Sequence, residues 1–162
     1  MRYLALVFCT ALVSFACDSP AGPGRPGGTP VTVLSTSVIL DLETSGLDAP
    51  RRLVIRNEAS WATFWDQATR HLSPQPELPA IDFGSSMVIA AAMGRRPTSG
   101  HSVRIDRVSP ADGEILVLVR QVSPGPGCPA AAVVTSPVVA ARTKRQEATV
   151  RFEVGEQTVS CQ

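Results

Sequence analysis

Apolar and polar side chains alternate along much of this chain, which is the pattern of β-strands that bury one face. The segments with strand-like patterns are 31–43, 52–56, 101–108, 114–122, 131–142 and 148–154. Residues 86–93 (SMVIAAAM) are almost continuously apolar, which predicts a central strand covered on both faces. Asp112-Gly113 is a turn signal and predicts a hairpin between the strands on either side of it.

One segment has a helical period instead of a strand period. Its apolar stripe consists of Trp61, Phe64, Trp65, Ala68 and Leu72. This spacing predicts an amphipathic helix whose tryptophans are core residues that hold it against the sheet. Asn57 is suited to cap its first turn, Arg70 suits the negative end of the helix, and Pro74 and Pro76 stop it.

The order of these elements predicts an α+β, mainly β fold. No connection is long enough for an obvious parallel crossover, so we expect an antiparallel sheet, as a sandwich or half-open barrel, that carries one amphipathic helix. Strand 148–154 is expected to pair back on strand 131–142 through the charged turn TKRQE. Pro137 cannot donate to a ladder, which places strand 131–142 at an edge or a bulge.

The N-terminal residues have a different organisation. Residues 1–16 have the layout of a secretory signal peptide, with Arg2 before an apolar run that is shorter than the roughly 20 residues of a spanning helix. Residues 17–30 are rich in proline and glycine, which predicts a flexible tether with a reach of about 20 Å. Residues 31–162 are predicted to form a single β-rich domain.

The junction between leader and tether contains Cys17. Residues 13–17 (VSFAC) resemble the lipobox of bacterial lipoproteins, whose cysteine receives a diacylglyceryl group, although that motif prefers leucine where Ser14 stands. The resemblance implies lipidation of Cys17 and a lipid anchor in the bacterial cell envelope, on a periplasmic or surface face. The alternative is ordinary cleavage after Ala16, which leaves Cys17 free or paired.

Two cysteines remain in the folded part. In an oxidising compartment, Cys128 and Cys161 are expected to form a disulfide. The alternatives are two free thiols or half of a metal site. The sequence offers no CxxC or HxxxH and only His71 and His101 as further ligands, so we predict no metal site.

Charge and motifs restrict the function classes. The formal net charge is +1 and falls to zero when Arg2 leaves with the leader, so no basic excess points to nucleic acid. Nucleophile-elbow, P-loop, zinc-protease and dinucleotide-binding motifs are all absent from the sequence. We therefore predict a protein without catalytic residues or cofactors, and the oligomeric state stays open.

One loop combines features of a turn and of a binding surface. It consists of Gly94, Arg95, Arg96, Pro97, Thr98, Ser99, Gly100 and His101. It is longer than a usual hairpin loop, and its glycines and proline are turn residues, so a wide turn is one interpretation. The other is a binding loop presented by a rigid sheet.

Several segments together resemble the C-terminal domain of the PrcB family, named after a lipoprotein subunit of a bacterial surface protease complex. The similar segments are 60–65 (SWATFW), 81–83 (IDF), 87–105 (MVIAAAMGRRPTSGHSVRI), 123–128 (SPGPGC) and 136–139 (SPVV). The family usually has glycine where Ser99 stands and an aromatic residue where His101 stands. The resemblance implies a non-catalytic envelope lipoprotein that binds or stabilises a protein partner such as a peptidase complex.

The same loop also has a second resemblance. Residues 96–100 (RPTSG) are similar to the N-P-T-T-G-Y loop of chagasin-type cysteine-peptidase inhibitors. That resemblance implies a peptidase inhibitor that presents the Gly94–His101 loop. An inhibitor would need a second and a third loop at the same end of the sheet to form a wedge.

Overall fold

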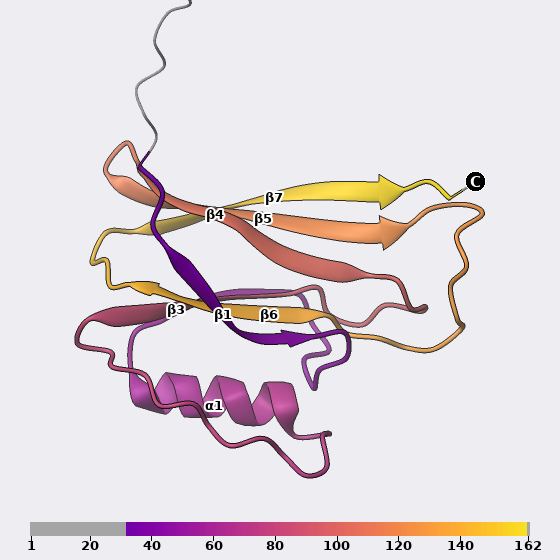
Figure 1. Cartoon of the computed structure of the whole chain (residues 1–162), viewed down its shortest axis with the longest axis horizontal. Helices are drawn as coiled ribbons and strands as arrows, with labels where there is room; N and C mark the ends of the chain where they lie inside the picture. The colour runs from indigo at the N-terminus through magenta and orange to yellow at the C-terminus, as the bar shows by residue number, and fades with distance from the viewer. Residues whose placement is uncertain (1–31, 162) are drawn as a thin grey trace, which may run out of the picture. The chain divides into compact units, whose positions relative to one another are not determined.

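The structure, a computed structural model, describes residues 32–161 as two β-sheets and one helix (Figure 1). The elements are β1 (Thr36–Leu42), β2 (Arg51–Ile55), α1 (Glu58–Thr69), β3 (Ser86–Ala92), β4 (Ser102–Ala111), β5 (Glu114–Pro124), β6 (Val138–Lys144) and β7 (Val150–Val159). The predicted mainly β fold with a single helix is therefore confirmed for this part of the chain. The signal peptide 1–16, Cys17 and the tether 17–30 lie outside the described residues.

The two sheets pack face to face as a sandwich, and the helix covers the outer face of one of them (Figure 1). The first sheet has the strand order β1-β6-β3-β2, and all its pairs are antiparallel. The second has the order β4-β5-β7, with β4 antiparallel and β7 parallel to β5. The described sheets do not close into a barrel.

Strand β3 is the centre of both cores, as its unbroken apolar sequence predicts. Val88, Ala90 and Ala92 lie in the core beneath α1. Met87 and Ile89 lie in the core between the two sheets. A strand that is buried on both faces has no position for a polar side chain, which explains why its pattern lacks alternation.

Helix α1 is fixed by its cap and by its two tryptophans. The Asn57 side chain accepts a hydrogen bond from the Ser60 amide at 2.8 Å, as the sequence predicts. Trp61 and Trp65 are 1% and 6% exposed, which confirms them as core residues. Their indole N–H groups donate to the carbonyls of Pro79 and Pro76, so neither buried donor lacks a partner. Leu72, the fifth member of the predicted stripe, lies beyond the end of the helix and is half-buried.

The hairpin between β4 and β5 forms where Asp112-Gly113 predicts it. Asp112 and Gly113 have φ angles of 51° and 81°, so both central turn residues are left-handed. Such a turn matches the twist of the flanking strands.

Two predictions about the C-terminal strands are wrong. Pro137 does not mark an edge strand, because β6 begins just after it, at Val138, and lies between β1 and β3. Strand β7 does not pair back on β6, since both edges of β6 are already occupied. It crosses to the other sheet and pairs in parallel with β5.

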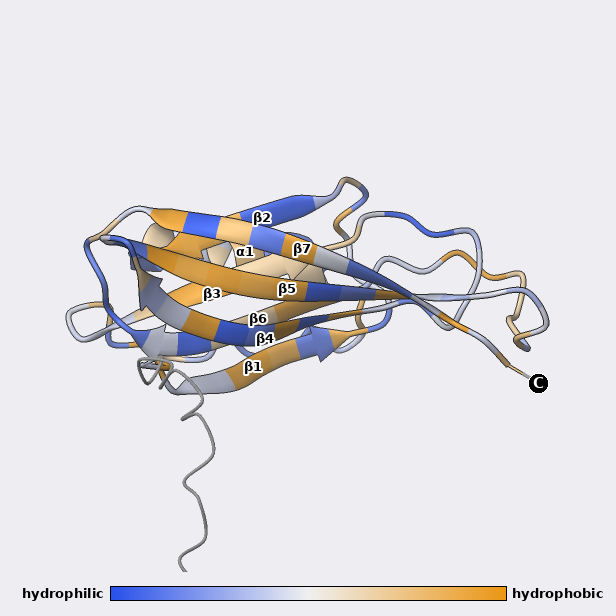
Figure 2. Cartoon of the chain, turned by 90° about the horizontal axis from the view of Figure 1, so that it is seen from above, coloured by the Kyte–Doolittle hydropathy of each residue, from blue (hydrophilic) through white to orange (hydrophobic). Residues whose placement is uncertain are grey.

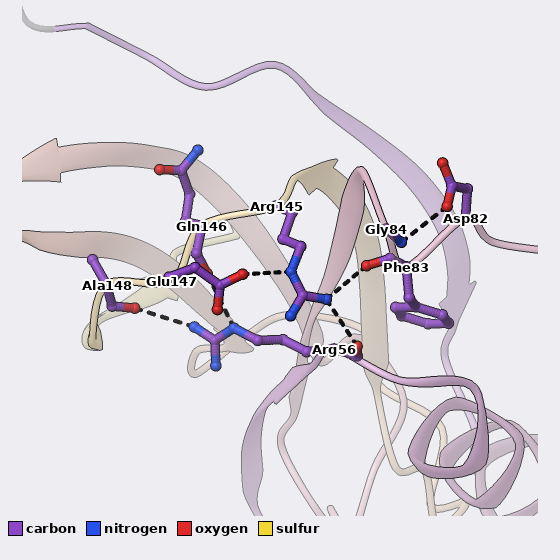
Figure 3. A network of polar contacts seen from close by, with 8 residues as sticks. All are labelled: Arg56, Asp82, Phe83, Gly84, Arg145, Gln146, Glu147 and Ala148. Carbon is purple, nitrogen blue, oxygen red and sulfur yellow. Dashed lines mark hydrogen bonds and ion pairs between the residues drawn. The ribbon is translucent and has the colours of Figure 1, made fainter.

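Two arginines hold the connection that makes this crossing (Figure 3). The Arg56 side chain donates to the carbonyls of Gln146 and Ala148, each at 3.1 Å. Arg145 donates to the carbonyls of Arg56 and Phe83, at 3.2 and 2.6 Å. The connection between β6 and β7 is thereby tied to the end of β2, which directs the chain away from a tight hairpin.

No helix in residues 32–161 is long and apolar enough to span a membrane.

Candidate functional site

The predicted loop Gly94–His101 connects β3 to β4, one strand in each sheet. Gly94 and Gly100 have φ angles of 71° and 86°. A Cβ on Gly94 would lie 2.8 Å from Pro50, so this position needs glycine both for its φ angle and for the space. The glycines of the loop therefore have the conformations of turn residues, and the loop also pairs with other connections, as follows.

The loop is paired along its length with a second connection, residues 125–137. Arg96 and Thr135 exchange two backbone hydrogen bonds of 2.8 and 3.0 Å. Ser99 donates from its amide to the Ala131 carbonyl at 3.0 Å, and its hydroxyl accepts from the Ala131 amide at 2.9 Å. The Thr135 hydroxyl donates to the Thr98 carbonyl at 2.9 Å. These bonds give the loop a defined conformation.

A third connection, residues 43–50, is attached to the same place. The Arg95 amide donates to the Asp48 carbonyl at 3.0 Å. Ser45 and Ser136 are both buried, and the Ser45 hydroxyl donates to the Ser136 carbonyl at 2.7 Å. We call the three connections 43–50, 93–101 and 125–137 the loop end. Figure 2 shows loops gathered at the end of the sandwich where the C-terminus lies.

The predicted disulfide belongs to the loop end. Cys128 and Cys161 are bonded, with their Cα atoms 4.8 Å apart. The Gly125 amide also donates to the Val159 carbonyl at 2.8 Å. The bridge therefore holds the connection 125–137 against the end of β7. For a closed loop of this size the chain-entropy model gives a stabilisation of roughly 3–4 kcal/mol.

His101 lies within the loop end and makes hydrogen bonds through both ring nitrogens. Its Nε2 is 3.2 Å from the Thr98 hydroxyl, and its Nδ1 is 3.1 Å from the Ser123 hydroxyl. Burial lowers the pKa of His101 below its usual value of 6.5, and the positive charge of Arg96 lowers it further. The ring is therefore neutral near pH 7 and joins the loop to β5.

The histidine of the loop end lies beside two carboxylates. His101 shares a hollow of about 340 Å³ with the exposed Asp41 and Glu43. Within residues 32–161, no group of three or more His, Cys, Asp and Glu side chains is arranged to hold a metal ion.

The surface of the loop end combines free positive charge with apolar side chains. Arg95 is exposed, Arg96 is half-buried, and the Nε of Arg96 has no hydrogen-bond partner among the described residues. The ion pairs of residues 32–161 involve other arginines than these two. Val133 and Val134 are 51% and 50% exposed and lie on the segment that pairs with Arg96. This arrangement suits contact with another protein.

The sequence indicated only part of this surface. Length and turn residues predict the loop Gly94–His101, but the apolar pattern predicts a strand over 131–142, whereas residues 131–137 belong to the connection before β6. The signal that could have corrected this is the composition of residues 124–130 (PGPGCPA), which is typical of a long loop. Residues 43–50 have no such signal, since their place depends on contacts that are distant in the sequence.

Comparison with known proteins gives one match. Residues 87–144 match the family model described as PrcB C-terminal. The match runs from β3 to the end of β6 and includes the whole loop Gly94–His101. The predicted resemblance to the PrcB C-terminal domain is thus confirmed over this segment. No curated protein and no solved structure matches the chain significantly.

Proposed function

Starting from the PrcB C-terminal match, we propose that this chain is a non-catalytic lipoprotein of the bacterial cell envelope that binds a protein partner, a peptidase complex, through its loop end. The carrying observation is the exposed pair Val133 and Val134 beside two arginines that have no ion-pair partner within residues 32–161. Guanidinium groups and desolvated apolar side chains are common anchors of protein interfaces.

The rigidity of the loop end supports the same proposal. Three connections, the disulfide and the two bonds of His101 fix this surface before any partner arrives. A fixed surface loses less conformational entropy on binding than a mobile loop would. Lipidation at Cys17 and a flexible tether would hold this surface near the membrane, where an envelope peptidase complex works.

The test is quantitative capture of a peptidase by the full chain, purified in detergent. We expect the double variant Arg95→Glu and Val134→Asp to capture at least about tenfold less peptidase than the wild type, because it reverses one charge and adds another at the centre of the surface. Both side chains are exposed, so the melting temperature should not change.

The matched control is Arg104→Glu and Val33→Asp, which changes one exposed arginine and one exposed valine that are not part of the loop end. This control should capture the wild-type amount. Equal capture by the two double variants would contradict a contact through the loop end.

A second candidate function, a cysteine-peptidase inhibitor, is favoured by one specific observation. The connections 43–50 and 125–137 lie beside the loop Gly94–His101, which is the wedge of three loops that an inhibitor needs. Titration of papain with the purified chain tests this candidate. Inhibition that is lost in Arg95→Glu/Val134→Asp would favour it, and full papain activity at saturating protein would dismiss it.

A further inference from the structure

A second surface, the outer edge of β2, has the form of a vacant strand position. Strand β2 is the last strand of the first sheet and, within residues 32–161, pairs only with β3. Its outer edge therefore presents backbone N–H and C=O groups to any segment that can align with them.

The opposite side of the sandwich is closed by the chain itself. The Leu34 amide donates to the Val108 carbonyl of β4 at 2.8 Å, and the Thr143 hydroxyl of β6 donates to the Ser35 carbonyl at 2.9 Å. The segment before β1 thus joins the two sheets there (Figure 1). On the side of β2, the bonds from Arg56 to the connection before β7 lie beyond the last residue of the strand, and no described strand pairs with the outer edge of Arg51–Ile55.

A groove on the helix side of β2 could accept side chains of an added strand. It is a hollow of about 420 Å³, lined by Arg51, Leu53 and Ile55 of β2 and by Thr63, Phe64 and Gln67 of α1. Leu53 and Phe64 give it apolar walls, and Thr63 is an exposed residue at its rim.

The other face of β2 is also apolar. Val54 of β2 and Phe152 and Val154 of β7 each pack against the core between the sheets, and all three are only partly buried. Successive side chains of a strand point to opposite faces. An added strand would place alternate side chains against Leu53 and Phe64 on one face and beside Val54 on the other.

The charge at one end of β2 specifies the chemistry of the occupant. Arg51 and Arg52 are exposed at the start of the strand. Arg51 donates to the Gln67 side chain at 3.0 Å, and neither arginine is in an ion pair within residues 32–161. In an antiparallel pairing, these arginines lie opposite the C-terminal end of the added segment.

We propose that the free edge of β2 binds an extended segment of a partner protein by antiparallel strand addition, and that this segment has apolar residues followed by acidic ones. The backbone ladder supplies the attachment, the groove and Val54 select the apolar residues, and Arg51 and Arg52 set the direction. The start of β2 adjoins the loop end, since Arg51 follows the connection 43–50 and pairs with Ala92, but this proposal does not depend on the function proposed for the loop end.

The probe is the fluorescein-labelled peptide Ser-Val-Thr-Val-Thr-Asp-Glu, with the reversed sequence Glu-Asp-Thr-Val-Thr-Val-Ser as the control. Fluorescence anisotropy with the full chain should show at least about tenfold tighter binding of the first peptide, because only it places the acids opposite the arginines. Amide NMR shifts on binding should be largest in Arg51–Ile55.

Variants separate this proposal from a non-specific contact. Arg51→Glu/Arg52→Glu should weaken binding at least about tenfold, and Arg104→Glu on β4 should leave it unchanged. Thr63→Trp, which fills the groove from its rim and keeps the charge, should also abolish binding. The loop-end variant Arg95→Glu/Val134→Asp should bind as the wild type, so the two proposals can fail separately.

Two results would overturn the proposal. One is equal affinity of the wild type for the two peptides, or equal affinity of the wild type and the Arg51→Glu/Arg52→Glu variant for the first peptide. The other is sedimentation of the chain alone as a dimer that this variant dissociates, which would assign the edge of β2 to a second copy.

Discussion

At the scale of single residues, His101 is a loop side chain with a structural role, because its ring links two segments of the chain. A plain turn would need only the glycines of this loop and would be indifferent to its histidine. Here the imidazole connects Thr98 of its own loop to Ser123 of β5. The PrcB resemblance implies an aromatic residue at this position. Histidine also provides a ring there, and in addition its two nitrogens make hydrogen bonds.

The lowered pKa of His101 predicts a specific pH dependence of stability. Because the folded pKa lies below 6.5, the unfolded chain binds this proton first, and the free energy of unfolding should fall as the pH decreases through 6.5 towards the folded pKa. His101→Phe keeps a ring but cannot titrate, so it should remove this part of the pH dependence. Urea unfolding between pH 5 and 8 measures it.

The control for this prediction is the exposed His71, the other histidine of the chain. His71→Asn should keep the wild-type dependence. The main charged group that acts on His101 is Arg96, and Asp41 and Glu43 line the same hollow. Identical pH profiles for the wild type and His101→Phe would show that the imidazole does not titrate differently on folding.

At the scale of elements, local sequence patterns predict those elements whose conformation and burial depend mainly on their own residues. The stripe of α1, its Asn57 cap and the two-sided apolar run of β3 are all readable in short windows. The turn at Asp112-Gly113 is equally local, because its positive φ angles are required by the turn itself.

The same patterns could not predict which strands pair. Residues 131–135 (AAVVT) are apolar or β-branched, but they belong to a loop that is held by Arg96 and Ser99. The strand that follows, β6, begins only at Val138. The place of β7 depends on Arg56 and Arg145, which bind carbonyls about 90 residues apart in the sequence. Such contacts have no periodicity, so sequence patterns alone miss them.

The burial of α1 predicts a large effect of one tryptophan. Trp65→Ala should lower the free energy of unfolding by about 3–5 kcal/mol, because it empties a buried site and leaves the Pro76 carbonyl without its donor. Chemical denaturation followed by circular dichroism measures the loss. Thr63→Ala on the exposed face of the same helix should change stability by less than about 0.5 kcal/mol. A loss below about 1 kcal/mol for Trp65→Ala would contradict a packing role for this side chain.

At the scale of the whole molecule, the sandwich brings together groups that the sequence keeps apart. The loop Gly94–His101 was recognisable by its turn residues, but its partners 43–50 and 131–135 become neighbours only when β6 enters the first sheet. The loop end is therefore assembled by the topology, and the place of residues 43–50 in it could not be predicted from any local window. Within residues 32–161, the same topology leaves the outer edge of β2 unpaired.

The anchor is the last feature that this arrangement makes testable. The loop end is useful to an envelope complex only if the domain stays at the membrane, and acyl chains on Cys17 would supply about 0.8 kcal/mol per buried methylene. Cys17→Ala should therefore either move the protein to the soluble fraction or leave it uncleaved with its leader attached. Detergent phase partitioning with intact-mass measurement distinguishes these products. The control is Cys9→Ala, which should be processed and anchored like the wild type because Cys9 lies within the predicted leader 1–16. A cleaved Cys17→Ala protein that still enters the detergent phase would show that attachment does not use this cysteine.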